Sequence, residues 1–244
     1  MEELIRLNKF LSSAGICSRR EADRLIEAGE VTVDGKRADM GMKVSPEARI
    51  CIRGKAIRPE ERKVLLLMNK PRGIICTAQM KEQPNIIEYL NYPIRVYPVG
   101  RLDKDSEGLI LLTNQGELVN RIMRAGNFHE KEYIVRVDRS IDEEFLQKMR
   151  KGVPILDTVT RPCPVERLSR DSFRIILTQG LNRQIRRMCE YLGYDVVRLK
   201  RVRIMNLKLN GLKTGEYREI TKRESEELEK LLKDSDSRPW KEKV

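Results

Sequence analysis

The sequence predicts an α+β fold in two parts, a small helical module followed by a larger domain built on a sheet. Apolar residues recur at helical spacing over residues 4–28, and short apolar segments bounded by glycine follow them. Val64 to Met68 is a continuous apolar run typical of a central strand, and residues 131–137 alternate as in a half-buried strand. With 244 residues, the chain fits one large or two modest domains of roughly 100–200 residues each.

The charge balance predicts a polyanionic partner. The chain has 49 Lys and Arg against 37 Asp and Glu, a net charge of +12. A surplus of this size favours nucleic acid or an anionic membrane surface. No apolar stretch approaches the ~18 residues of a membrane-spanning helix, and the amphipathic N-terminus does not resemble a signal peptide. Five dispersed cysteines indicate reduced thiols in a cytosol. We therefore expect a cytoplasmic protein that binds nucleic acid and no membrane.

The sequence lacks the residue patterns of metal and nucleotide chemistry. It has no C-x-x-C, no phosphate-binding G-x-x-x-x-G-K-[ST] and no dinucleotide-binding G-x-G-x-x-G after a strand. Its one histidine, His129, is interpreted as a surface or packing residue. We expect no metal and no cofactor, so that carboxylates, Lys, Arg and Tyr carry any chemistry.

The first module is expected to hold two helices and several short strands. One helix is predicted over residues 4–14. The second begins after Ser18, whose side chain and Glu21 form a capping-box pattern, and runs to about Ala28. Strands are predicted at 31–33, 50–53 and 55–57, with a tight turn at 34–35. Basic residues on this module form a candidate phosphate-binding face, namely Lys9, Arg19, Arg20 and Arg24. A solvated helix surface is the alternative, because acidic residues are mixed among them.

The larger domain is expected to combine strands and helices. Strands are predicted at 64–68, 94–99, 109–113, 131–137, 163–167, 173–177 and 196–205. Helices are predicted at 86–90, 116–124, 142–151 and 224–232, and another leads from the 180–188 segment to about residue 192. The polar residues 233–244, with Trp240, are predicted to be a disordered tail.

Two charged segments are candidates for function. The loop between Gly100 and Gly108 carries five charged residues beside an expected buried sheet, and loops held by a rigid scaffold often carry chemistry. A solvated turn is the alternative. Residues 196–205 alternate basic and apolar, which predicts a strand with one cationic face for a nucleic-acid backbone. A charge-protected edge strand is the alternative there.

Several motifs carry a family resemblance. Residues 5–60 resemble an S4 RNA-binding domain, through S-R-R-E-A at 18–22 and G-E-V-T-V-D-G at 29–35. Four further blocks occur in order: N-K-P-R-G at 69–73, G-R-L-D-K-D-S-E-G-L-I-L-L-T-N at 100–114, K-E-Y-I-V at 131–135 and G-L-N-R-Q-I-R-R-M at 180–188. Together they resemble the RsuA/RluB/RluE/RluF family of pseudouridine synthases. Residues 124–133 and 151–160 are similar to the F-type large-subunit (23S) rRNA synthases in particular.

The resemblance implies a domain plan and a reaction. It implies an S4 domain over residues 1–62, a catalytic domain with a mixed, mostly antiparallel sheet over 63–223, and a helix end and tail over 224–244. The reaction is isomerisation of a specific uridine in 23S rRNA to pseudouridine, with the base flipped out of its stack. The expected partner is RNA, and the expected state is a monomer.

The resemblance also assigns roles to residues. Asp103 matches the catalytic aspartate, the expected nucleophile. Arg186 matches the arginine that pairs with it and favours its ionised form. Tyr133 matches the aromatic that stacks on the flipped uracil, and Arg101 the residue that fills the gap in the RNA. The other RNA contacts expected in this domain are Leu102, Lys104, Lys131, Asn182, Arg183, Gln184 and Arg187.

Without the resemblance, several assignments stay open. Asp105 and Glu107 rank equally with Asp103, Tyr133 fits an ordinary sheet core, and Arg187 fits the role of its neighbour Arg186. The function also has alternatives: the same reaction on a tRNA anticodon loop or 16S rRNA, or a non-catalytic RNA-binding or ribosome-assembly factor. The last is disfavoured because a pure binder has no need of an anionic residue in a cationic groove.

Overall fold

The computed structural model describes residues 4–58, 60–78 and 82–235, which form two compact units. The first comprises the N-terminal part through Val64 with residues 92–96 and 114–116, and the second comprises the rest. The predicted tail at 236–244, with Trp240, lies outside the described residues. No helix in the described part of the chain is long and apolar enough to cross a lipid bilayer.

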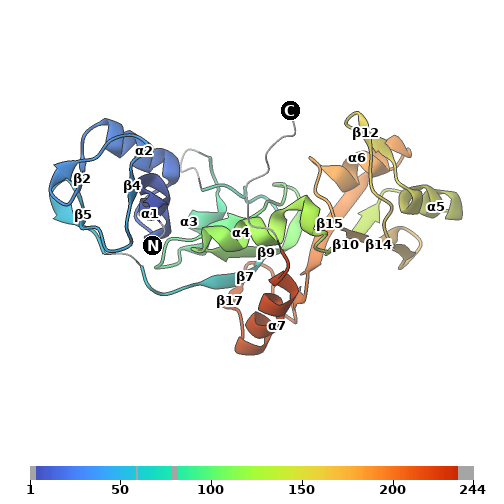
Figure 1. Ribbon diagram of the computed structural model, residues 1–244. Helices are drawn as coiled ribbons and strands as arrows, with labels where there is room; N and C mark the ends of the chain where they lie inside the picture. Colours follow the sequence, from blue (N-terminus) through green and yellow to red (C-terminus); the bar gives the residue numbers. More distant parts are fainter. Residues whose placement is uncertain (1–3, 59, 79–81, 236–244) are drawn as a thin grey trace. The chain divides into compact units, whose positions relative to one another are not determined.

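In the first unit, two helices pack against short strands (Figure 1). Ser18 caps α2 by accepting a hydrogen bond from the backbone N–H of Glu21, as its position in the sequence predicts. The helix expected from residue 4 begins only at Leu7, because Ile5 and Arg6 pair instead with a strand at residues 43–44. The elements are β1 Ile5–Arg6, α1 Leu7–Ser13, α2 Arg19–Glu27, β2 Val31–Val33, β3 Lys36–Arg37, β4 Lys43–Val44, β5 Ile50–Ile52 and β6 Lys55–Ala56.

The second unit is built on one long sheet. Its main path runs β13-β14-β10-β15-β9-β7-β17, with β8 beside β9 and β16 beside β15. Only the β15–β9 pairing is parallel among the described strands of this sheet, so the predicted mixed, mostly antiparallel sheet is confirmed. The strands are β7 Leu65–Lys70, β8 Tyr97–Val99, β9 Glu107–Thr113, β10 Lys131–Val137, β13 Val165–Arg167, β14 Ser172–Leu177, β15 Val196–Ile204, β16 Leu207–Lys208 and β17 Tyr217–Glu219.

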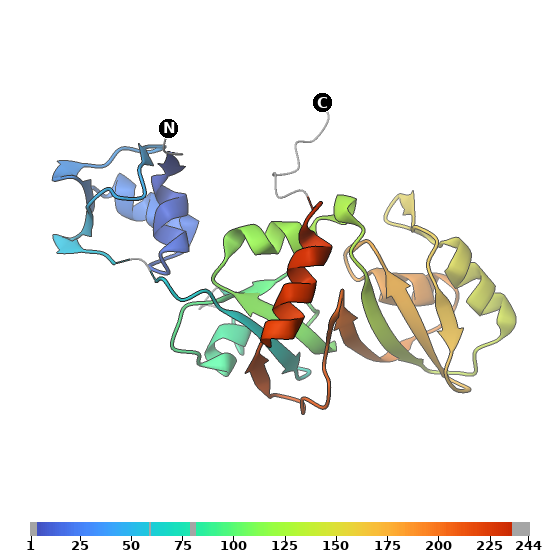
Figure 2. The same ribbon diagram turned by 60° about the horizontal axis from the view of Figure 1, so that its bottom comes forward.

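Helices bury two separate hydrophobic cores against this sheet. One core joins α4 and α7 to β7 and β9, and Figure 2 shows α7 lying across these strands. The other joins α5 and α6 to β10, β14 and β15. Arg201 is in register with Gly108, so Leu199 and Leu109, which lie in different cores, project to opposite faces of the sheet. The helices are α3 Ile86–Leu90, α4 Gly116–Met123, α5 Glu143–Lys151, α6 Gln184–Tyr191, α7 Lys222–Leu232 and the 3₁₀ turn η1 Ala125–Asn127.

The boundaries of two strands differ from expectation, and one hairpin was not expected. The strand predicted from residue 94 begins at Tyr97. The strand predicted from Cys163 begins at Val165, because the Cys163 N–H bonds to the Arg150 carbonyl and Pro164 has no N–H to donate. A two-residue hairpin, β11 Pro154–Ile155 with β12 Thr158–Val159, was not predicted.

The expectation of a wholly cationic face on residues 196–205 is wrong. Two register shifts against β10 interrupt the alternation of β15. Arg198 lies 2.6 Å from Glu107, and Arg203 lies 2.7 Å from Glu132, so carboxylates compensate both guanidinium groups. Arg201 is only 1% exposed. The basic residues of β15 are therefore used largely within the sheet, and they do not form an open RNA-binding track.

The close approach of β9 to β15 requires glycine at position 108. Gly108 has φ +106°, and a Cβ there would overlap the backbone carbonyl of Arg201. Gly193 has φ +81° with open space around it, which makes it a matched control. We predict that Gly193→Ala lowers the unfolding free energy by about 1–2 kcal/mol, because alanine is strained in the left-handed backbone conformation and no steric overlap adds to that cost. Gly108→Ala should cost clearly more in urea denaturation, because the strands must separate as well. Equal losses would contradict the steric requirement.

Candidate functional site

A pocket of about 380 Å³ opens in the second unit beside the charged loop 100–106. Arg101 and Asp103 line it from this loop, Lys131 and Tyr133 from β10, and Arg201 from β15. Tyr133 and Arg201 are directly opposed across the strands, so both side chains project from the same face of the sheet. The size lies within the range of small-ligand pockets, about 300–1,000 Å³.

The charged loop is fastened to the last residue of β7 and to the segment that follows it. The backbone N–H of Gly73 donates to the Lys104 carbonyl at 2.7 Å, and the Leu102 N–H donates to the Cys76 Sγ at 3.4 Å. The Lys70 ammonium donates to the Ser106 carbonyl at 2.8 Å. Three points along the loop are thus held by the residues of one short segment, so the loop backbone has a defined course.

Lys70 is a buried cation within this arrangement. Its side chain is 0% exposed, and its Nζ also donates to the Pro71 carbonyl at 2.8 Å. Burial lowers the pKa of Lys70, while the nearby Asp105 and Asp103 carboxylates oppose that shift. The ammonium is therefore supported by backbone carbonyls and by the negative charge of the loop.

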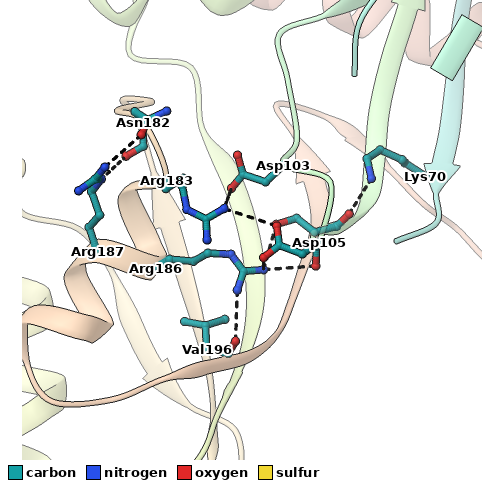
Figure 3. A network of polar contacts seen from close by, with 9 residues as sticks. Lys70, Asp103, Asp105, Asn182, Arg183, Arg186, Arg187 and Val196 are labelled. Atoms are coloured by element: carbon teal, nitrogen blue, oxygen red, sulfur yellow. Dashed lines mark hydrogen bonds and ion pairs between the residues drawn. The ribbon is translucent and has the colours of Figure 1, made fainter. Parts of the chain in front are cut away.

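Two arginines of the 180–188 segment face the acidic residues of the loop (Figure 3). Arg183 Nη1 lies 3.8 Å from Asp103 Oδ2 and 3.5 Å from Asp105 Oδ1. Arg186 Nη2 lies 3.2 Å from Asp105 Oδ2. Arg186 Nη1 also donates to the Val196 carbonyl at 3.2 Å, and Nη2 to the Ser106 hydroxyl at 3.3 Å. The cluster joins the loop to α6 and β15.

The expected pairing of Arg186 with Asp103 differs from the observed one. The direct partner of Arg186 is Asp105, because its bonds to β15 and to the end of the loop hold the guanidinium there. Asp103 is reached instead by Arg183, which adopts a left-handed conformation at the start of α6. Burial raises the pKa of Asp105, but Arg186, a backbone N–H and Arg183 outweigh it, so that pKa is below its usual value.

The three carboxylates of the loop have distinct surroundings. Asp103 lines the pocket, whereas Asp105 and Glu107 do not. Asp105 is engaged by Arg186, and Glu107 accepts from Arg198 at 2.8 Å. The Asp103 carboxylate has only the long contact to Arg183 among the described residues. It is therefore the carboxylate most available to a molecule in the pocket.

The other expected RNA contacts are divided between the pocket and its surroundings. Leu102, Asn182 and Gln184 line the pocket. The Gln184 side chain also accepts a hydrogen bond from the Leu181 N–H at 3.1 Å, so it supports the turn at residues 181–184 that precedes α6. Arg187 donates to the Asn182 carbonyl at 3.1 Å and lies outside the pocket, as does the exposed Lys104. The candidate phosphate-binding residues of the first unit, apart from half-buried Lys9, are exposed on α2: Arg19, Arg20 and Arg24.

Some residues of the site were not singled out by the sequence. Cys76 and Ser106 hold the loop or its arginine, and Arg201 was placed only in a cationic strand. The N-K-P-R-G motif signals Lys70, but its contact with the loop follows from the pairing of β7 with β9. His129 Nε2 lies 2.8 Å from the Ser235 hydroxyl and does not line the pocket, which agrees with a packing role.

Comparison with known proteins gives a consistent family. The model of the RNA pseudouridylate synthase family matches residues 64–191, and the S4 domain model matches residues 5–50. The dual-specificity RNA pseudouridine synthase RluF of Escherichia coli (strain K12) is 54% identical, over 96% of this chain and 81% of the relative. The ribosomal large subunit pseudouridine synthase B of Bacillus subtilis (strain 168) is 38% identical, over 93% of this chain and 96% of the relative.

A solved structure agrees with these matches. The crystal structure of a pseudouridylate synthase is similar with a TM-score of 0.68 at 29% identity, covering 92% of this chain and 99% of that one. The family model covers Asp103, Tyr133 and Arg183, which line the pocket, and Arg201 lies beyond its matched range. The chain belongs to the RNA pseudouridylate synthase family, and it carries an S4 domain at its N-terminus.

Proposed function

We propose that this protein isomerises a uridine of large-subunit (23S) rRNA to pseudouridine, with Asp103 as the nucleophile. The observation that carries the proposal is the position of Asp103. It is the one carboxylate of the acidic loop that lines the pocket, and it faces a site that also holds Tyr133. Isomerisation requires a group that attacks the nucleoside while the base is detached and turned, and an ionised carboxylate is suited to that.

The pocket accommodates a nucleotide that has left its stack. A base inside a helix is out of reach of a recessed carboxylate, so the target must be extruded at a cost of a few kcal/mol. Tyr133 offers a ring on which the uracil stacks, a contact worth roughly 1–3 kcal/mol. Arg101 is exposed at the pocket, where its planar cation is suited to stack in the gap left in the RNA.

Arg186 acts in this proposal as a positioning residue. It binds the second half of the loop through Asp105 and Ser106 and does not line the pocket. Arg183 is the guanidinium beside Asp103, with its Nη1 3.8 Å from the carboxylate. Together the two arginines keep the loop in one geometry, so that the nucleophile is presented without rearrangement.

The choice of RNA rests on the relatives. One relative is named for the large ribosomal subunit, and another is named a dual-specificity RNA enzyme. We therefore propose large-subunit rRNA as the substrate, with a tRNA anticodon loop as a second one. The S4 domain, assigned to residues 1–62 ahead of a catalytic domain at 63–223, contributes phosphate contacts through Arg19, Arg20 and Arg24. We propose that the protein acts as a monomer in the cytoplasm.

Replacement of Asp103 tests the proposed nucleophile. We predict that Asp103→Asn lowers the rate of pseudouridine formation by at least about 10⁴-fold, because removing a nucleophile has effects on that order. RNA affinity should remain. Asp105→Asn is the matched control, and we expect it to retain measurable turnover because that carboxylate lies outside the pocket. Tritium release from RNA with 5-tritiated uridine measures the rate. Full activity of Asp103→Asn would rule out the mechanism.

Arg186 and Arg187 provide a matched pair for the positioning role. We predict that Arg186→Met lowers the unfolding free energy by about 1 kcal/mol for each partly buried acceptor left without a donor, which is the low end of the cost for a buried group. The Val196 and Asp105 carbonyls are such acceptors. Arg187→Met should stay within about 0.5 kcal/mol of the wild type, as surface substitutions usually do. Urea denaturation compares them, and equal stabilities of the two variants would contradict the role given to Arg186.

The substrate is tested in cells that lack the gene. Pseudouridine mapping by carbodiimide modification and primer extension should reveal the loss of a site in 23S rRNA. The wild-type gene should restore that site, and the Asp103→Asn gene should not. Loss confined to tRNA or 16S rRNA would refute the large-subunit assignment while leaving the reaction intact.

A further inference from the structure

Two buried cations lie at the pocket, and the proposed mechanism gives neither of them a role in the chemistry. Lys131 is 4% exposed and Arg201 is 1% exposed, and both line the pocket with Tyr133. No carboxylate lies within ion-pair distance of either side chain in the described part of the chain, although Asp103 lines the same pocket. Burying a cation without a counter-ion is costly, so this pair needs a functional explanation.

The hydrogen bonds of the two cations are incomplete. Lys131 Nζ donates to the His129 carbonyl at 3.1 Å, and Arg201 Nε donates to the Leu109 carbonyl at 2.7 Å. Arg201 Nη2 is buried and has no hydrogen-bond partner within the described residues. An ammonium has three donors and a guanidinium has five, so donors remain for a ligand. These remaining donors suit an acceptor that carries negative charge.

The geometry supports one shared target for both groups. Lys131 and Tyr133 are two residues apart on β10, so their side chains leave the same face of the strand. Arg201 is opposed to Tyr133 on β15. A ring stacked on Tyr133 would therefore have both cations beside its edge. Burial first, and Arg201 second, lower the pKa of Lys131 to about 8, so Lys131 is mainly protonated at neutral pH.

The reaction generates negative charge on such a ring. If Asp103 forms a bond to C1′, the electron pair of the C1′–N1 bond leaves with the uracil, which becomes an anion. If Asp103 instead adds to C6, the C5–C6 π electrons move onto C5 and the O4 carbonyl. In both routes the C1′–N1 bond breaks with its electron pair left on N1, C5 forms the new bond to C1′, and the carboxylate departs from C1′ or from C6. The C5 proton is then released to water and N1 takes up a proton, so that the net change is an isomerisation. The ring carries transient negative charge in either case.

We infer that Lys131 and Arg201 form an anion-binding pair that stabilises the uracil ring while it carries this charge. The inference rests on the proposed function and assigns Lys131 a role in the reaction in place of a contact with the RNA backbone. Fixed donors aimed at developing charge in a water-poor site are effective because they need no reorganisation. The expected effect of losing one such donor is a rate loss of about 10²–10³-fold.

The test compares Lys131→Met on two RNAs, one with uridine and one with 5-fluorouridine at the target. Fluorine withdraws electrons and makes the detached ring a more stable anion, so it needs less help from the protein. In single-turnover assays we expect a loss of about 10²–10³-fold on uridine and a loss at least about tenfold smaller on 5-fluorouridine. Nuclease digestion and mass spectrometry measure consumption of the parent nucleoside on both RNAs.

Three controls separate the possible outcomes. Lys131→Arg keeps the charge and should retain most activity, and thermal melting should show both variants folded. Lys148→Met, an exposed lysine on α5, should behave as the wild type. Equal losses on the two RNAs, or a loss confined to RNA affinity and its salt dependence, would overturn the inference. Absence of pseudouridine formation by the wild type would instead overturn the proposed function.

The pH profile gives an independent readout. The charged groups that line the pocket with Lys131 are Arg201 on β15, Asp103 and Arg101 on the loop, and Arg183 beside α6. The Lys131 charge is present below its pKa of about 8 and is lost above it. The kcat/KM of the wild type should therefore fall as pH rises through about 8, and that of Lys131→Arg should not. Coincident profiles for the two proteins would contradict the assignment.

Discussion

The site depends on one buried ammonium, that of Lys70, which holds the charged loop to the sheet. Without a counter-charge an ammonium in this position would be strongly disfavoured. Backbone carbonyls of Pro71 and Ser106 accept hydrogen bonds from it, and the acidic loop supplies the nearby negative charge. The same contact therefore explains why a lysine is tolerated at the end of a buried strand and why the loop follows a single course.

Within the fixed loop, each carboxylate has a different binding partner. Glu107 forms an ion pair with Arg198 of β15, and Asp105 forms an ion pair with Arg186 of α6. Asp103 is left at the pocket with a single long contact. The carboxylates that form close ion pairs with arginines and the carboxylate that we propose reacts are thus different residues. Such a division lets the nucleophile stay available while its neighbours provide rigidity.

Much of this organisation follows from the sequence. The periodicity of 131–137 and the apolar run at 64–68 identified β10 and β7. Only the family resemblance of residues 100–114, and not their charges, ranked Asp103 above Asp105 and Glu107. Which arginine contacts which aspartate did not follow, because it depends on the left-handed backbone of Arg183 and on hydrogen bonds from Arg186 to β15. The misjudged cationic strand has a similar cause. Its partners, Glu107 and Glu132, come from other strands, and a linear pattern does not reveal them.

The central claim is that Asp103, and not Asp105, meets the ribose and base of an extruded uridine. A crystal structure of the protein bound to RNA with 5-fluorouridine at the target measures this directly. The account predicts the nucleotide in the pocket, its base against Tyr133, and the Asp103 carboxylate as the acidic group nearest to C1′ and C6. A target base that remains stacked in the RNA, or a reacting nucleotide that lies closer to Asp105 than to Asp103, would contradict it.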